Sequence, residues 1–175
     1  AIIMTLLILE VHVPELLTHS MEEFRSAMWE LAPKLGSFAF SFLTIAIFWV
    51  NHHHFFHRVR FVDWRLLWLN NSLLFWLSVV PFTTAFLGDD SMHPGVVSLY
   101  CFVMGMAALS FSLMTRYVFF AGTCPLIDEH VPVKERKKEF RRSLVGTISY
   151  LSASVLAFVL LPLAQLLLLF VPVFF

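Results

Sequence analysis

The sequence predicts an all-α membrane protein, and three observations support this fold class. The 175-residue chain is 59% hydrophobic, only 14% of its residues are charged, and its mean hydropathy is +0.80. About a quarter of a soluble chain is normally charged, so a soluble fold of this composition would leave much apolar surface in water. Twenty phenylalanines and five tryptophans are typical of side chains that face lipid and its interfaces.

Apolar runs and turn signals predict one unit over residues 1–175 with six transmembrane helices. The expected elements are a first helix over 1–11, an amphipathic outer surface helix over 14–34, spans over 36–56, 64–87, 96–120 and 144–161, and a sixth span after Pro162. Pro14 ends the first helix, and residues 121–142 form a basic cytoplasmic loop, with a helix possible from Val133. The first run spans about 16 Å against roughly 30 Å of hydrocarbon, so we expect both terminal helices to be incomplete here.

The distribution of basic residues predicts the orientation. If the segment Trp49–Arg60 faces the cytoplasm, ten of the twelve Lys and Arg lie on that side, and only Arg25 and Lys34 lie outside. The positive-inside rule favours this arrangement, with both termini cytoplasmic. The zero net charge gives no reason to expect a nucleic-acid partner. We therefore expect a multi-pass membrane protein.

The segment "WVNHHHFFHRVR" holds four histidines within six residues. A membrane metalloenzyme is one explanation, because His53 and His57, or His54 and His57, share a helix face and a pair of imidazoles can ligate zinc. A closed site needs about four ligands, and no second histidine box or carboxylate pair on this side completes one. We therefore predict no metal and no cofactor, and interpret the cluster as interhelical hydrogen-bonding groups.

Two further classes of membrane protein have to be weighed. A secondary transporter usually has internal repeats and ionisable groups within its spans, and these spans are nearly free of charge. A membrane scaffold without transport activity is the other class, and the sequence does not distinguish it from a channel.

The segments "AIIMTLLILEVHVP", "WVNHHHFFHRVRFVDWRLLWLN" and "LLFWLSVVPFTTAFLG" resemble the potassium channels named for the endosomal and lysosomal channel of animals, transmembrane protein one-seventy-five. The resemblance covers the first three predicted spans. It implies six helices per repeat, a pore lined by the first helix, and a homotetramer of one-repeat prokaryotic subunits in the inner membrane. The ordinary T-V-G-Y-G filter loop is absent from this family and from this sequence.

The resemblance also implies which residues act. Bulky apolar side chains of the first helix make the pore constriction, which here correspond to Ile2, Leu6 and Leu9, with Thr5 beside them. Their spacing of four and three places the apolar three on one helix face. We therefore expect passive flux of K⁺ and other monovalent cations, with modest selectivity for K⁺ over Na⁺ because such a ring offers no oxygen ligands.

A second set of residues is expected to hold the pore segment in place. The family signature R-x-x-x-F-S-D, which packs on polar residues of the next two helices, would precede Ala1 and is not in this sequence. Its partners here would be a latch formed by Trp49, Asn51, His52, His53 and His57.

Overall fold

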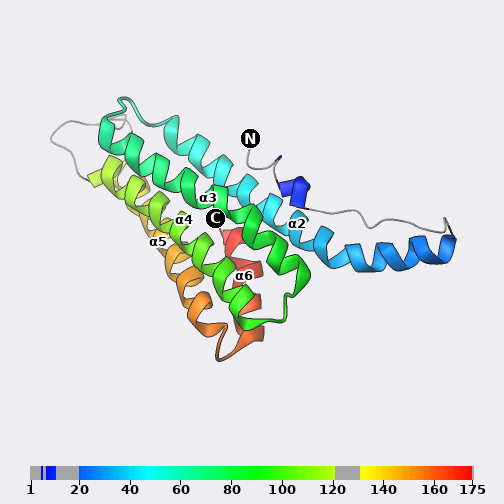
Figure 1. The fold of residues 1–175 in the computed structure, drawn as a ribbon. Coiled ribbons are helices and arrows are strands. Elements are labelled where there is room, and N and C mark those ends of the chain that lie inside the picture. The colour runs from blue at the N-terminus through cyan, green and yellow to red at the C-terminus, as the bar shows by residue number, and fades with distance from the viewer. Residues whose placement is uncertain (1–4, 6, 11–19, 121–130, 175) are drawn as a thin grey trace.

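The computed structural model describes residues 5, 7–10, 20–120 and 131–174 of the chain. In chain order the elements are the 3₁₀ turn η1 (Leu7–Glu10) and the helices α2 (Met21–Phe56), α3 (Trp64–Asp89), α4 (Pro94–Phe120), α5 (Val133–Leu156) and α6 (Leu161–Phe174). Figure 1 shows the helices as one bundle, from which the first turns of α2 extend sideways.

The prediction of six transmembrane helices is wrong. The described residues form five α-helices, and only α2, α3 and α4 are long and apolar enough to cross a membrane. Of the predicted first helix, only Thr5 and η1 are described, and the remaining positions of 1–11 lie outside the described residues. In α5 only the stretch after Arg142 lacks charge, about 21 Å, and α6 is of similar length, so both are shorter than the hydrocarbon layer.

Helix α2 joins the predicted surface helix and the next span into one element. Its 36 residues extend about 54 Å, well beyond the thickness of the hydrocarbon layer. Ser20 caps it, since its hydroxyl accepts the Glu23 backbone N–H at 3.1 Å. Pro33 lies within the helix without ending it. Residues 11–19 lie outside the described residues. They include the first six residues of the predicted surface helix, 14–19.

Helices α2 and α3 pack as an antiparallel pair. At one end the Lys34 ammonium lies 2.9 Å from the Asp89 carboxylate, and Gly88 allows the two backbones to approach closely. Further along, the Thr84 hydroxyl donates to Ser41 Oγ at 2.8 Å. The same Ser41 Oγ lies 2.9 Å from the hydroxyl of Tyr100 on α4, and all three residues are buried. These bonds satisfy polar groups that would otherwise be unpaired in an apolar interior.

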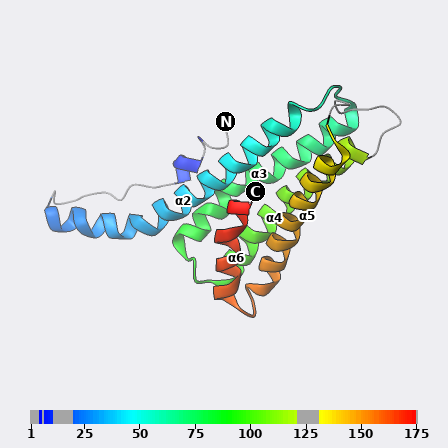
Figure 2. The ribbon, with the colours of Figure 1, turned by 180° about the vertical axis from the view of Figure 1, so that it is seen from behind.

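Helix α4 is the central element, packed against both α3 and α5. Hydroxyl pairs join α4 to α5: Ser112 to Thr147 at 2.9 Å, and Ser98 to Ser154 at 3.1 Å. Small polar residues let helices approach closely in membranes while satisfying one another. After Leu156 the chain turns, and α6 runs back beside α5 (Figure 2).

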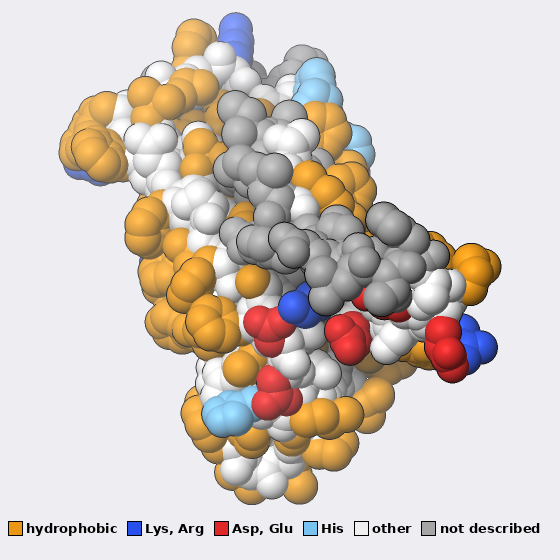
Figure 3. Space-filling view, turned by 45° about the vertical axis from the view of Figure 1, so that its right-hand side comes forward, with side chains coloured by type: hydrophobic (Ala, Val, Ile, Leu, Met, Phe, Trp, Pro, Cys, Tyr) orange, Lys and Arg blue, Asp and Glu red, His pale blue; other side chains and the backbone are white. Residues whose placement is uncertain are grey.

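The face of the bundle seen in Figure 3 carries many apolar side chains. Trp68, Phe75 and Phe82 on α3 remain 67%, 59% and 56% exposed. Monomeric soluble proteins rarely expose contiguous apolar surface on this scale. The exposed aromatic residues therefore indicate a surface that faces lipid or other subunits.

Candidate ion pathway and histidine cluster

The predicted ion pathway lies at the edge of the described structure. Ile2 and Leu6 are outside the described residues, and Leu9 is placed only through the backbone of η1. Thr5 is exposed, whereas Leu7 is fully buried in the core formed with the neighbouring helices. η1 lies against α2 and α3. Leu7 thus anchors this segment to the bundle, and the assignment of pore positions remains a prediction.

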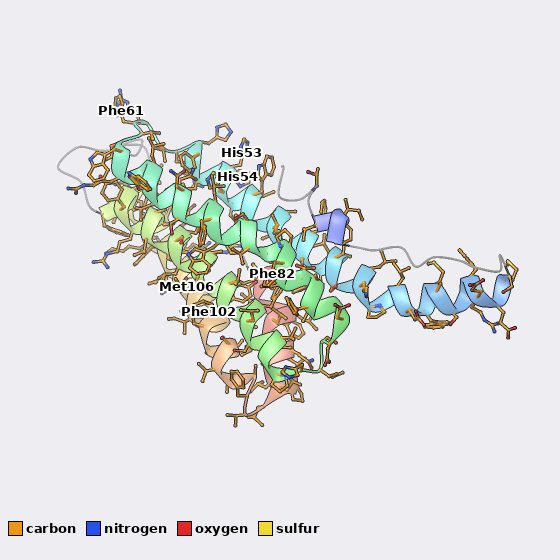
Figure 4. All side chains as sticks on the ribbon, viewed as in Figure 1. His53, His54, Phe61, Phe82, Phe102 and Met106 are labelled. Carbon is orange, nitrogen blue, oxygen red and sulfur yellow. The ribbon has the colours of Figure 1, made fainter. Side chains whose placement is uncertain are left out.

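The histidine cluster occupies the last turns of α2, where Figure 4 labels His53 and His54. His52 points toward the bundle. Its Nε2 lies 2.8 Å from Asn70 Oδ1 on α3, and its ring contacts Phe56 with centroids 4.6 Å apart. An amide oxygen can only accept, so the His52 Nε2 must carry the hydrogen. This bond joins α2 to α3 through His52, one residue of the predicted latch.

His53, His57 and Trp49 form an exposed stripe on α2. The Trp49 and His53 rings stack at 5.2 Å with only 10° between their planes. His53 Nε2 and His57 Nε2 are 3.0 Å apart. One nitrogen must donate and the other accept, which requires that at least one imidazole be neutral. Trp49 is 50% exposed, so this stripe lies on the surface of the bundle.

His54 faces a third direction, into a pocket of about 210 Å³ between α2, α4 and α5. The pocket also contains the ion pair between Arg58 and Glu139, together with Asn51 and Thr115. The ion pair connects the end of α2 to the start of α5, 81 residues later. The four histidines therefore do not converge. Within the described ranges, no three His, Cys, Asp or Glu side chains come together as a metal site.

Asp63 closes the same end of the bundle. Its carboxylate caps α3 by accepting the Leu66 backbone N–H at 2.9 Å, and it also accepts a hydrogen bond from the Tyr117 hydroxyl on α4. These bonds, that of Tyr117 first, hold the pKa of the Asp63 carboxyl below its usual value. These contacts link four helix ends at one end of the bundle, here called the basic end: the ends of α2 and α4 and the starts of α3 and α5.

The sequence reasoning missed the partners in these contacts. Asn70, Tyr117 and Glu139 lie 18, 54 and 81 residues from the groups they bind. The sequence offered one usable signal, because a polar side chain within an apolar run needs a partner in a neighbouring helix.

The N-terminal half matches a known family. The family model described as "Endosomal/lysosomal potassium channel TMEM175" matches residues 1–81. A potassium channel of Streptomyces collinus is 33% identical over 172 residues, covering 93% of this chain and 79% of that protein. The chain belongs to the TMEM175 family of potassium channels.

Other TMEM175 relatives agree. A potassium channel of Chryseobacterium sp. is 32% identical over 118 residues, which are 67% of this chain and 58% of that protein. A crystal structure of a lysosomal potassium-selective channel TMEM175 homolog from Chamaesiphon minutus has a TM-score of 0.83 with 26% identity. That match covers 99% of this chain and 88% of the other. The chain is a prokaryotic member of a channel family, it is not an enzyme, and it is an integral membrane protein.

Proposed function

We propose that this chain conducts K⁺, and other monovalent cations less readily, as a passive channel in a prokaryotic inner membrane. The observation that carries the proposal is the match of nearly the whole fold to a potassium-selective TMEM175 homolog. The metalloenzyme and scaffold alternatives have no support in these comparisons.

The proposed ion pathway is the N-terminal segment of each subunit in a homotetramer. Ile2, Leu6 and Leu9 would form apolar rings around the axis, with Thr5 as the nearby oxygen donor. The exposure of Thr5 beside buried Leu7 supports a segment with one face on the bundle and one face turned away from it. Apolar rings gate by dewetting and discriminate weakly between hydrated ions.

The proposed role of Trp49, Asn51, His52, His53 and His57 is to hold that pore segment as a latch. Two observations support it. His52 binds Asn70 and so fixes the end of α2 on α3. Trp49 stacked on His53, with the His57 ring edge-on to His53, is then presented outward, as a docking surface requires.

The proposed orientation places the basic end of the bundle, and both chain termini, at the cytoplasmic face. The start of α5 alone carries six Lys or Arg against two Glu, and such an excess is retained on the cytoplasmic side. Helix α6 runs back toward this end, since its residue Val171 lines the same hollow as Lys138 and Arg141.

A flux measurement tests the proposal. The full chain is purified, reconstituted in liposomes and given an outward K⁺ gradient, with a fluorescent dye reporting the compensating uptake of protons. We expect uptake that starts only when a proton carrier is added and is slower when Na⁺ replaces K⁺. Protein-free liposomes are the control, and flux equal to that control would exclude a channel.

A further inference from the structure

A hollow of about 320 Å³ lies between α5 and the last turns of α6. It is lined at one end by Lys138, Arg141 and Arg142, and at the other by Val145, Ser149 and Val171. This hollow is separate from the pocket at His54, on a different side of α5, although Arg142 borders both.

The hollow is polarised along its length. Residues 138, 141, 142, 145 and 149 follow the three- and four-residue spacing that places them on one face of α5. The rise per residue makes the distance along the helix from Lys138 to Ser149 about 16 Å. A ligand that fills the hollow therefore meets cationic groups at one end and an apolar wall at the other.

Lys138 and Arg141 bring charge to the cationic end that no acidic side chain of the described residues pairs with. Glu139, the carboxylate nearest in sequence, is paired with Arg58 of α2. Lys138 and Arg141 make no ion pair within the described part of the chain. Both are exposed, so an anion can reach them without displacing a protein group.

The level of the hollow in the membrane follows from the packing. The Arg58–Glu139 and Tyr117–Asp63 contacts align the start of α5 with the ends of the membrane-spanning helices α2, α3 and α4. Lys138, Arg141 and Arg142 therefore lie at the height of the lipid headgroups, and Val145, Ser149 and Val171 lie below them, beside the acyl chains.

We propose that this hollow binds one anionic phospholipid, with the phosphate among Lys138, Arg141 and Arg142 and an acyl chain along Val145, Ser149 and Val171. Each Lys or Arg near an anionic membrane surface contributes attraction of about 1 kcal/mol. A soluble phosphate would leave the apolar wall unused. A second copy of the chain around an axis along the membrane normal would bring its own basic end to this level, and like charges would oppose it.

Native mass spectrometry of the full chain in detergent tests the proposal, with phosphatidylglycerol and phosphatidylcholine added at equal concentration. We expect bound phosphatidylglycerol in preference to phosphatidylcholine. The double variant Lys138→Gln/Arg141→Gln should weaken phosphatidylglycerol binding about 25-fold, given about fivefold per charge. The matched control is Lys134→Gln/Lys137→Gln, which removes the same charge from the same helix but from residues outside the hollow. Equal losses in the two variants would overturn the site, because they would indicate diffuse attraction.

Two further measurements separate the possible occupants. Val145→Trp narrows the apolar end at a residue that is already 56% exposed, and it should reduce phosphatidylglycerol binding while glycerol phosphate binding stays unchanged. Phosphatidylglycerol binding that Val145→Trp leaves unchanged would instead indicate a site for the phosphate alone and would overturn the proposal. A photo-crosslinking amino acid at position 145, in a chain embedded in phosphatidylglycerol nanodiscs, should capture lipid. Covalent dimers of the chain in place of lipid adducts would show that a second copy fills the hollow and would overturn the proposal.

Discussion

The imidazole of His52 donates a hydrogen bond from α2 to the side-chain oxygen of Asn70 on α3, across 2.8 Å. Both residues are half-buried at the basic end. Within the cluster, His52 forms a side-chain hydrogen bond to a residue of another helix. The contact is therefore where a structural role of the cluster is most directly tested.

His52→Ala should lower the free energy of unfolding by about 1 kcal/mol, because Asn70 loses its partner in a partly buried position. His52→Gln should restore part of this loss, since its amide can donate to the same oxygen. Thermal unfolding in detergent, followed by tryptophan fluorescence, measures both. In the double-mutant cycle with Asn70→Ala, the two single losses should not add. Additive losses would mean that the bond contributes nothing.

The close approach of α2 and α3 gives a second prediction. A Cβ at Gly88 would lie 3.1 Å from the Lys34 Cα and 2.8 Å from Ser37 Oγ. Because a backbone atom cannot move as a side chain does, Gly88→Ala should cost about 1–3 kcal/mol of stability. Gly36→Ala is the matched control: nothing lies within 4 Å of its Cβ position, and alanine should stabilise α2 by about 0.5–1 kcal/mol. The thermal midpoints of the two variants should move in opposite directions.

Asp63 predicts a pH dependence of stability. Its pKa is lowered in the folded state, first by the Tyr117 hydroxyl and then by the Leu66 N–H. The resulting stabilisation is fully present above the unfolded pKa of about 4 and is lost as the pH falls through the lowered folded value. Tyr117→Phe should therefore be less stable than the natural chain at pH 6, and should lose less stability below pH 4.

The control for this prediction is Tyr100→Phe, a second tyrosine of α4 whose hydroxyl binds Ser41 and no carboxylate. It should lower stability at every pH and leave the acid slope as it is. Chemical unfolding at a series of pH values between 6 and 2.5 measures both variants. If Tyr117→Phe keeps the natural slope below pH 4, the hydroxyl does not set the Asp63 pKa.

Composition and periodicity were enough to predict a helical membrane protein, and the quoted segments were enough to predict its family. One local signal would have predicted the start of α2. Ser20 followed by Glu23 is a helix-start signature, and α2 begins there. The basic stretch after Val133 lies in α5, because Lys, Arg and Glu favour helix when apolar residues further along hold the helix on the bundle. A reading by hydropathy alone separates these charged turns from the span that follows them.

Contacts between helices could not be predicted in the same way. The pairing of Ser41 with Tyr100, or of Arg58 with Glu139, depends on how far each helix is rotated and shifted against its neighbour. That rotation depends on the packing of many side chains at once, and this packing cannot be deduced from the residue pattern of a single sequence. The count of membrane spans failed because the apolar parts of α5 and α6 are too short to cross the hydrocarbon layer, and hydropathy alone does not locate the ends of a helix.

The last prediction concerns the proposed apolar ring. We expect Ile2 to form the narrowest ring of the tetramer, with Thr5 one turn away as the nearby oxygen donor. Such a ring would have no oxygen to replace the hydration shell, so we expect ions to pass with water around them, and K⁺ to be preferred only because its shell is lost more easily. Ile2→Asn should wet and widen the ring, raising Na⁺ permeation and bringing the K⁺/Na⁺ permeability ratio close to one.

Leu9→Ala, the control, should change that ratio less, because it removes apolar bulk from a ring that is not the narrowest. Reversal potentials of reconstituted channels under biionic K⁺/Na⁺ conditions measure the ratio for each variant. If Ile2→Asn leaves both conductance and ratio unchanged while Leu9→Ala alters them, the constriction lies at Leu9, and the register proposed for the N-terminal segment is incorrect.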